Sequence, residues 1–311
     1  MQPYEPQTHL VQADQAGLTV EELAEQIAGS AGLIAARRGG AWLGQRRVEP
    51  ATQPVAPGDQ LTLRFPPGGH YADYVLQTAQ ICYEDPWLLV LDKPSGMYVA
   101  ATPWDTQGTV LAALTRFLLA RDGVAPPLHL AHRLDRDTSG LLLISKHPGI
   151  NGPLQAAFAE GRVQKQYLGL CSGLPNWEQQ HLQTGHGRSA GGRWRIYPLE
   201  EVGRILPMGG GKVKLAHTSF HVQTRLNDAA LIVADLHTGR THQIRLHLAH
   251  LGHPLLGDQR YGGPAHYQEH PLAGHMLHAA TLSLRHPHTG EGLRFSSDLP
   301  AAFQQILLRE G

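Results

Sequence analysis

The sequence contains little cysteine. Cys82 and Cys171 are the two cysteines among 311 residues; they lie far apart, and neither belongs to a Cys-x-x-Cys motif. A zinc ribbon and a dithiol redox site both need closely spaced cysteines, so this spacing excludes them. Reduced thiols in a cytoplasmic protein are therefore expected rather than a disulfide.

Long apolar runs are also missing. No stretch approaches the roughly eighteen apolar residues that a membrane-spanning helix needs. The N-terminal segment MQPYEPQTHLVQADQ has neither a basic start nor an apolar stretch, and so does not look like a targeting signal. These absences predict a soluble protein with no membrane partner.

Net charge is absent too, because 26 lysine and arginine residues balance 26 aspartate and glutamate residues. Holding nucleic acid by bulk positive charge is therefore not indicated. The distribution is more informative, because arginine outnumbers lysine and its planar guanidinium suits phosphates and stacked bases. Genomic bias would explain the abundance of arginine but not its clustering. The clusters are Arg37 with Arg38, Arg46 with Arg47, Arg188 with Arg193 and Arg195, and Arg240 with Arg245.

The length exceeds the roughly 100 to 200 residues of one typical domain, so a small and a large domain are expected. We predict a small module over residues 1–70, a linker over 71–80 and the main domain over 81–311. In the module, residues 18–38 have helical periodicity, with Thr19 as the N-cap. Gly29 and Gly32 should interrupt this helix, and short strands are expected at 41–43 and 61–63.

The main domain alternates apolar runs with turn signals. Residues 174–215 are rich in glycine and arginine and have little periodicity, which is typical of an insertion with hairpin character. Strands are expected at 87–91, 141–144, 164–170, 215–224, 229–236, 278–284 and 292–295, and helices at 109–119, 154–160, 242–251 and 300–309.

The most informative stretch is HRLDRDTSGLLLISK, residues 132–146. Its polar first half passes at Gly140 into the apolar run of a buried strand. Thr138, Ser139 and Gly140 are turn formers that can fold the preceding carboxylates over the strand, as in an active-site loop. By composition alone, a charged surface loop with ion pairs is the alternative.

This stretch resembles the signature of the RluA-type pseudouridine synthases, in which the Asp after Arg-Leu is catalytic. The resemblance extends over residues 78–311 and implies an α+β fold, with a mixed, mostly antiparallel sheet and a central catalytic cleft. Residues 8–66 are similar to a small α/β RNA-binding module of the ribosomal-protein type, although Gly44-Gln45 replaces the usual Asn-Gly. RNA contact by this module and a purely structural role both remain open.

A second matching stretch, LHTGRTHQIRLHLAHLGHPLLGDQRYGG, covers residues 236–263. A helix starting near Gly239-Arg240-Thr241 could receive an anion at its N-terminus. The Lys93-Pro94-x-Gly96 element also matches the family, but Asp92 departs from its usual Asn.

The resemblance implies residue roles. It makes Asp135 the catalytic carboxylate and Arg245 its cationic partner. Tyr167, in a Lys-x-Tyr element, is the third residue expected to be catalytic; it would stack on the uracil and could take part in the proton transfer from C5. Isomerisation of uridine involves no redox change or external group, so no cofactor is expected. The residues expected to bind the substrate are Arg133, Lys165, Arg240, His242, Thr138 and Lys93.

Twenty histidines invite a metal interpretation, above all His242, His247, His250 and His253. Their spacing only partly suits zinc, and no His-Glu-x-x-His pair occurs. Asp258 is the one nearby carboxylate at a suitable offset. We therefore predict core or RNA-facing histidines and no metal site.

The sequence thus predicts a cytoplasmic, monomeric RNA pseudouridine synthase, an isomerase that acts on specific uridines of structured RNA. Ribosomal RNA is favoured over tRNA as the partner. Two alternatives remain: a non-catalytic RNA-binding or ribosome-assembly protein with the same fold, and a glycosidic hydrolase, which would release free uracil.

Overall fold

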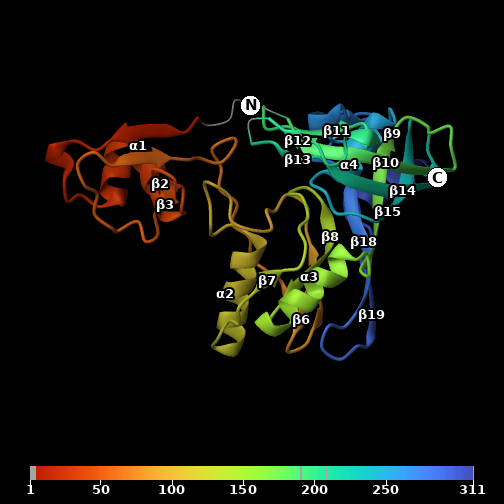
Figure 1. Cartoon of the computed structure of the whole chain (residues 1–311), viewed down its shortest axis with the longest axis horizontal. Coiled ribbons are helices and arrows are strands. Elements are labelled where there is room, and N and C mark those ends of the chain that lie inside the picture. The colour runs from red at the N-terminus through yellow and green to blue at the C-terminus, as the bar shows by residue number, and fades with distance from the viewer. Residues whose placement is uncertain (1–4, 190, 208, 311) are drawn as a thin grey trace. The chain divides into compact units, whose positions relative to one another are not determined.

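The computed structural model describes residues 5–189, 191–207 and 209–310. The chain forms two compact units (Figure 1). The first comprises Met1–Leu76 and Met97–Pro126, and the second comprises Gln77–Gly96 and Pro127–Gly311. The sequence-based division differs at residues 97–126, which it assigned to the main domain. No helix of the described residues is long and apolar enough to cross a membrane.

The first unit contains a four-stranded sheet in the order β1-β4-β2-β3. Leu61 and Leu63 of this sheet are buried in one core with Leu23 of α1. Thr19 caps α1 in a capping box, and Gly29, at a φ of 59°, interrupts the helix as predicted. The elements of this unit are β1 (Gln7–Leu10), η1 (Ala13–Gln15), α1 (Val20–Arg37), β2 (Ala41–Leu43), β3 (Arg46–Arg47), β4 (Gln60–Leu63) and α2 (Val110–Asp122).

An ion pair explains why residues 97–126 belong to the first unit. Arg38 follows α1 and contacts Asp105 through Nη2 at 2.8 Å, and the backbone carbonyl of Arg38 accepts a hydrogen bond from the Thr106 N–H. Trp42 of β2 also donates from its indole to the Pro103 carbonyl at 2.7 Å. These contacts join residues 38–42 to residues 103–106, and the periodicity of the sequence does not predict contacts between segments so far apart.

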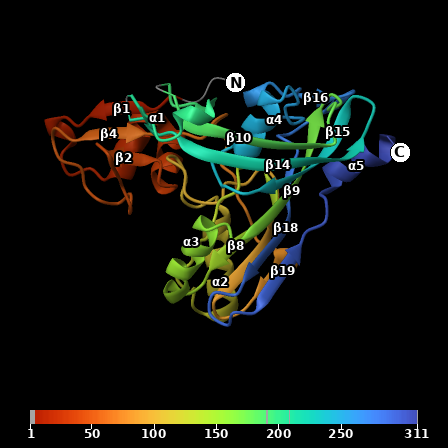
Figure 2. The same ribbon diagram turned by 45° about the vertical axis from the view of Figure 1, so that its right-hand side comes forward.

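The second unit is built on an eleven-stranded sheet in the order β11-β10-β14-β15-β9-β18-β8-β6-β5, with β19 paired to β18 and β7 to β8. Figure 2 shows the long strands β14, β15, β9 and β18 in this unit. The strands are β5 (Ile81–Glu84), β6 (Leu88–Lys93), β7 (His129–Leu130), β8 (Ser139–Ser145), β9 (Gln164–Ser172), β10 (Gln179–Arg188), β11 (Trp194–Tyr197), β14 (Lys214–Arg225), β15 (Ala229–Leu236), β18 (Leu277–Arg285) and β19 (Gly292–Ser296).

The pairing confirms the predicted sheet type. Each pair of strands is antiparallel except β8 with β18, which is parallel over the short register His278↔Ser139 and Ala279↔Gly140. β8 is buried at every residue, which is why its sequence is a continuous apolar run rather than an alternating one. β8 lies between β18 and β6, so the polar loop that precedes it is placed beside these two strands.

Helices and short elements complete the second unit. Leu141 and Leu143 of β8 form one core cluster with Leu154 of α3, and α5 contributes Phe303 and Ile306 to another. The remaining elements are η2 (Thr78–Gln80), η3 (Pro148–Ile150), α3 (Asn151–Ala159), η4 (Leu199–Glu201), β12 (Ile205–Leu206), β13 (Gly211–Lys212), α4 (Gln243–His250), η5 (Gln259–Tyr261), β16 (His266–Tyr267), β17 (His270–Pro271) and α5 (Ala301–Glu310).

The insertion is more regular than its sequence suggests. Within residues 174–215, β10 and β11 form an antiparallel hairpin that extends the sheet beyond β14. β10 contains Gly185 and Gly187, which have low intrinsic strand preference. A Cβ at Gly185 would meet the Pro198 carbonyl at 2.9 Å, so close packing requires glycine here. Tertiary contacts, not local propensity, fix this strand.

Gly140 allows the close approach of strands β8 and β18, and its substitution tests that contact. Its φ is +100°, and a Cβ would lie 2.3 Å from the Ala279 carbonyl oxygen across the parallel β8–β18 pair. Gly140→Ala should therefore lower the free energy of unfolding by more than about 2 kcal/mol. Urea unfolding measures this change, with Gly152→Ala in α3, where a Cβ meets nothing within 4 Å, as the control. Equal stabilities of the two variants would contradict the close strand approach.

Candidate active site

The loop that carries Asp135 is held from three sides. Its backbone turns where the Thr138 N–H donates to the Asp135 carbonyl at 3.2 Å. The turn lies at residues 136–137, just before the predicted turn residues, because Ser139 and Gly140 already belong to β8. The Thr138 hydroxyl hydrogen-bonds His275 Nε2 at 2.8 Å. Buried Lys93, at the end of β6, donates from Nζ to the carbonyls of Pro94 and Arg136 at 2.7 and 2.9 Å. The loop is thus fixed by the two strands that flank β8.

Arg245 links two carboxylates that are far apart in the sequence. Its Nη1 donates to Asp135 Oδ2 at 2.9 Å. Its Nε and Nη2 donate to Asp258 Oδ2 and Oδ1 at 2.7 and 2.8 Å, a bidentate pair. Because Asp258 holds two of the guanidinium nitrogens, the third is aimed at Asp135. The predicted pairing of Arg245 with Asp135 is present in the structure.

The surroundings keep Asp135 ionised. Burial raises the pKa of its carboxyl, but the neighbouring His242 and the Arg245 guanidinium lower it by more, so the pKa lies below its ordinary value. Burial also lowers the pKa of Arg245, and its bonds to Asp258 and Asp135 outweigh that effect and raise it. At neutral pH the pair is therefore a carboxylate beside a guanidinium.

His242 lies near the other oxygen of the Asp135 carboxylate, the one that Arg245 does not contact. Its Nε2 lies 3.7 Å from Asp135 Oδ1, and its Nδ1 hydrogen-bonds the Tyr261 hydroxyl at 2.7 Å. Burial lowers the pKa of His242 to about 4, so the imidazole is neutral at pH 7. His242 has a φ of 58°, a costly conformation for a residue with a side chain. The Tyr261 bond and the start of α4 hold it there.

α4 begins within one residue of the predicted helix 242–251, but after the stretch where an anion was expected. The helix begins at Gln243, not at Gly239-Arg240-Thr241, and His242 is its N-cap. The Gln243 side-chain oxygen accepts from the Arg240 N–H at 2.9 Å and from the Thr238 hydroxyl at 2.8 Å. The chain's own glutamine therefore occupies the place where an anion was expected.

Tyr167 lies on β9 beside the central strands and is 6% exposed. Burial, and then the charge of Asp135, raise the pKa of its phenol, which places Tyr167 in the electrostatic reach of the carboxylate and keeps it protonated. Lys165, two residues earlier, lies over the Phe158 ring at 5.3 Å. Burial lowers the pKa of Lys165 to about 8.

Comparison with known proteins agrees with this geometry. Residues 87–250 match the family model described as RNA pseudouridylate synthase. The chain belongs to the RNA pseudouridylate synthase family. It is 39% identical over 262 residues to RNA pseudouridine synthase 1 of Oryza sativa subsp. japonica, covering 72% of this chain and 73% of the relative. It is 34% identical over 236 residues to ribosomal large subunit pseudouridine synthase D of Zymomonas mobilis subsp. mobilis, covering 73% and 71%.

A solved structure agrees as well. Human RNA pseudouridylate synthase domain containing 4 superposes with a TM-score of 0.60 at 25% sequence identity, covering 75% of this chain and 93% of the human one. The chain is therefore an RNA pseudouridine synthase of the RluA type, an isomerase with the α+β fold of this family.

Within this pseudouridine synthase, the predicted residues fall into two groups. Asp135, Arg245 and His242 are in direct contact or close to it, and Tyr167 is electrostatically coupled to Asp135. Thr138 and Lys93 are buried, so in this structure they position the catalytic loop. Their roles as direct substrate contacts remain predictions, like those of Arg133, Lys165 and Arg240.

Arg133 and Arg240, two of the predicted substrate-binding residues, have no ion pair with Asp135 or Asp258 among the described residues. Arg133 is exposed, and the structure gives it no ion pair with any described residue, whereas Arg136 pairs with Asp137 at 2.7 Å. Arg240 donates from Nε to the Leu215 carbonyl at 2.8 Å, which joins it to β14. The surface-loop alternative would pair Arg133 with Asp135 and Arg136 with Asp137, and among the described residues only the Arg136–Asp137 pair is observed.

Sequence reasoning missed three supporting residues. Asp258 was considered only as a possible metal ligand, yet it is the bidentate partner of Arg245. Tyr261 and His275 were not singled out. A sequence signal existed only for Asp258, a carboxylate just after the apolar pair Leu255-Leu256, where a buried charge needs a partner.

The four histidines of the metal interpretation have separate surroundings. His247 lies between the hydroxyls of Thr184 and Thr218, at 3.0 and 2.9 Å. His253 Nδ1 bonds the Ser172 carbonyl at 3.1 Å, His242 bonds Tyr261, and His250 is exposed on α4. These contacts support the prediction of core and surface roles.

Lys93 makes stability depend on pH. Burial lowers its pKa to about 7 from 10.5, so between these values the unfolded chain binds a proton that the folded chain does not. The free energy of unfolding should therefore rise with pH across this window, and be flat below it. Lys93→Met should remove much of this rise between about pH 7 and pH 9 in urea unfolding. Lys212→Met, at an exposed lysine, is the control, and an unchanged pH slope in Lys93→Met would contradict the assignment.

Proposed function

We propose that this pseudouridine synthase acts on structured ribosomal RNA, with Asp135 as the group that acts at the sugar of the target uridine. The observation that carries the proposal is the ionised Asp135 carboxylate, aimed by an Arg245 that Asp258 holds in place. The substrate class is supported by relatives named ribosomal large subunit pseudouridine synthase D in Zymomonas mobilis and C in Pasteurella multocida.

The reaction sets clear demands on the site. The bond between the sugar C1′ and the uracil N1 breaks, the uracil turns, and a bond forms between C1′ and C5. The C5 proton leaves and N1 gains a proton, so no atom is lost or added. An anionic carboxylate can attack C1′ as a nucleophile or assist a glycal intermediate, and both routes need Asp135 ionised. The salt bridge to Arg245 supplies this state.

Tyr167 is suited to binding the uracil of the target uridine. Its raised pKa favours the neutral phenol, so Tyr167 is suited to stacking on the uracil and to donating a hydrogen bond rather than to acting as a base. His242, neutral with a pKa of about 4, offers a hydrogen-bonding nitrogen beside Asp135. Arg133, exposed in the same loop, is suited to filling the place of a flipped base.

We also infer a cytoplasmic monomer. Both cysteines are unpaired, with Cys82 exposed and Cys171 buried, and an exposed free thiol fits a reducing compartment. A size-exclusion measurement with in-line light scattering tests the monomer.

Asp135→Asn should abolish pseudouridine formation, because the amide keeps the shape of the side chain but not its charge, while RNA affinity should stay within about tenfold. The assay digests ribosomal RNA incubated with each protein to nucleosides and separates pseudouridine from uridine by chromatography, because the two isomers have the same mass. Asp228→Asn, in the exposed turn between β14 and β15, is the control. Turnover by Asp135→Asn would overturn the catalytic assignment. Release of free uracil by the unmodified protein would show a hydrolase instead.

Arg133 and Arg245 should fail in different ways. Flipping a uridine out of a stacked helix costs a few kcal/mol, and Arg133 can offset part of this only when the RNA is folded. Arg133→Ala should therefore lose more activity on a structured RNA than on a short unstructured one. Arg245→Lys, which keeps a charge but loses the bidentate geometry, should be equally poor on both. Single-turnover kinetics on the matched RNAs measures this, and equal losses of Arg133→Ala on both would contradict the flipping role.

A further inference from the structure

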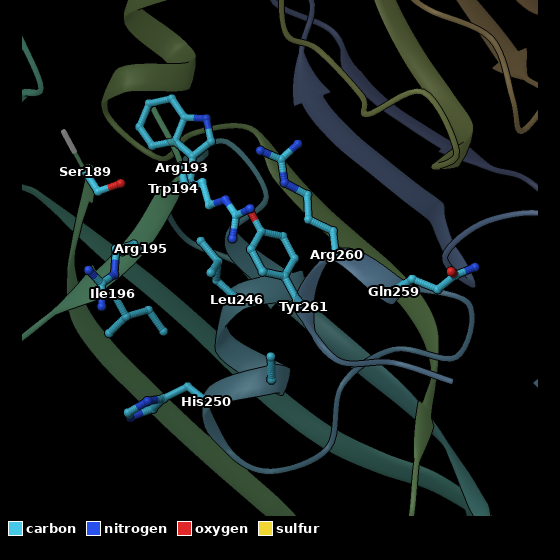
Figure 3. A pocket seen from close by; sticks show the side chains of 11 residues that line it. Ser189, Arg193, Trp194, Arg195, Ile196, Leu246, His250, Gln259, Arg260 and Tyr261 are labelled. Atoms are coloured by element: carbon cyan, nitrogen blue, oxygen red, sulfur yellow. The ribbon is translucent and has the colours of Figure 1, made fainter. Parts of the chain in front are cut away.

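A cavity lies next to the residues around Asp135, with Tyr261 in its lining. It has a volume of about 920 Å³, within the range of roughly 300 to 1,000 Å³ that takes a small ligand. Figure 3 shows its lining side chains, which come from β11 and the residues just before it, from α4, and from residues 259–261. The lining residues are Ser189, Arg193, Trp194, Arg195, Ile196, Leu246, Ala249, His250, Gln259, Arg260 and Tyr261.

Positive charge in this pocket is not neutralised. Among the residues that the structure describes, Arg193, Arg195 and Arg260 have no carboxylate partner, and all three are exposed. Three other surface arginines of the same unit are paired with glutamates: Arg162 with Glu160, Arg204 with Glu201 and Arg225 with Glu178. Three guanidinium groups without an acidic neighbour, around one cavity, suit a phosphodiester anion.

Trp194 adds an aromatic surface. Its indole stacks on the ring of His186 at a centroid distance of 5.2 Å and an interplanar angle of 22°. His186 is 2% exposed, so one face of the indole packs against a buried ring. Trp194 itself is half-buried and lines the pocket. A supported indole with an accessible part is suited to stacking a nucleobase, whichever base it is.

The pocket and the active site share Tyr261. This side chain lines the pocket, and its hydroxyl bonds His242, which lies beside Asp135. The Arg245 guanidinium lies over the Tyr261 ring, 5.0 Å from its centroid. A strand whose uridine reaches Asp135 would therefore have a neighbouring nucleotide on the other side of Tyr261.

We propose that this pocket, named here the Trp194 pocket, binds a nucleotide adjacent to the target uridine in the same RNA strand. The base stacks on Trp194, and the phosphate is bound by Arg193, Arg195 and Arg260. The assignment rests on the proposed function for the position of the target uridine, but its binding chemistry does not depend on catalysis. β10 and β11, the part of the chain with the least periodic sequence, thereby take part in choosing the RNA.

Tryptophan fluorescence tests the stacking. A short oligouridylate should quench the emission of the unmodified protein, because a stacked base quenches indole. Trp194→Phe should lose most of this quenching, and Trp177→Phe, at another half-buried tryptophan packed near a histidine, should keep it. Trp194→Ala should bind the oligouridylate about 5- to 150-fold more weakly. Equal quenching of Trp194→Phe and the unmodified protein, or quenching of neither, would overturn the proposal.

Salt dependence tests the arginines. Replacing Arg193, Arg195 and Arg260 together by Gln should weaken binding of the oligouridylate. The slope of log affinity against log salt should also fall by about 0.7 for each phosphate that is no longer neutralised. The matched control replaces Arg162, Arg204 and Arg225 by Gln, which removes the same charge from sites where a glutamate already neutralises it. Equal reductions of affinity in the two triple variants would show that only net charge matters and would overturn the pocket.

Two further results separate this proposal from the proposed function. Uridine monophosphate that binds as tightly as the oligouridylate would show a site for a free nucleotide and overturn the assignment to an RNA strand. Pseudouridine formation with wild-type single-turnover rates in Trp194→Ala, at subsaturating RNA, would overturn the pocket while the catalytic role of Asp135 stands. If Trp194→Phe loses the quenching but the unmodified protein forms no pseudouridine in ribosomal RNA, the Trp194 pocket would be supported and the proposed function refuted.

Discussion

The active site depends on the guanidinium of Arg245 lying between two carboxylates. A buried carboxylate without a partner is strongly destabilising, and a single arginine that reaches only one oxygen can rotate. Asp258 removes that freedom by taking two of the three nitrogens, at 2.7 and 2.8 Å. The remaining nitrogen then meets Asp135 at 2.9 Å. Asp258 thus positions the Arg245 guanidinium against Asp135.

This arrangement is possible because the sheet brings distant segments together. Asp135 precedes β8, Arg245 lies on α4 after β15, and Tyr167 lies on β9, which pairs with both β15 and β18. The short parallel contact of β8 with β18 requires a glycine at position 140, where a Cβ would lie 2.3 Å from a carbonyl oxygen. The loop that carries Asp135 is therefore placed by the contact between β8 and β18.

A chain with no net charge can still bind RNA, because the charges are sorted in space. Many arginines away from the site are paired with acids, whereas those described in the Trp194 pocket are not. Local positive potential then comes from unneutralised groups and not from composition. Under the proposal for the Trp194 pocket, such a surface binds an RNA strand that places its phosphates at those positions.

The sequence by itself determined the family, the pairing of Arg245 with Asp135, and most of the regular elements. β8, α2 and the Thr19 cap follow from apolar runs and capping residues, which are local signals. The tertiary structure decided what depends on distant partners. Residues 97–126 belong to the first unit through the Arg38–Asp105 ion pair, and β10 exists through its pairing with β14. Asp258 acquires its role only when folding brings it against Arg245, because no sequence spacing encodes the direction in which a buried guanidinium is aimed.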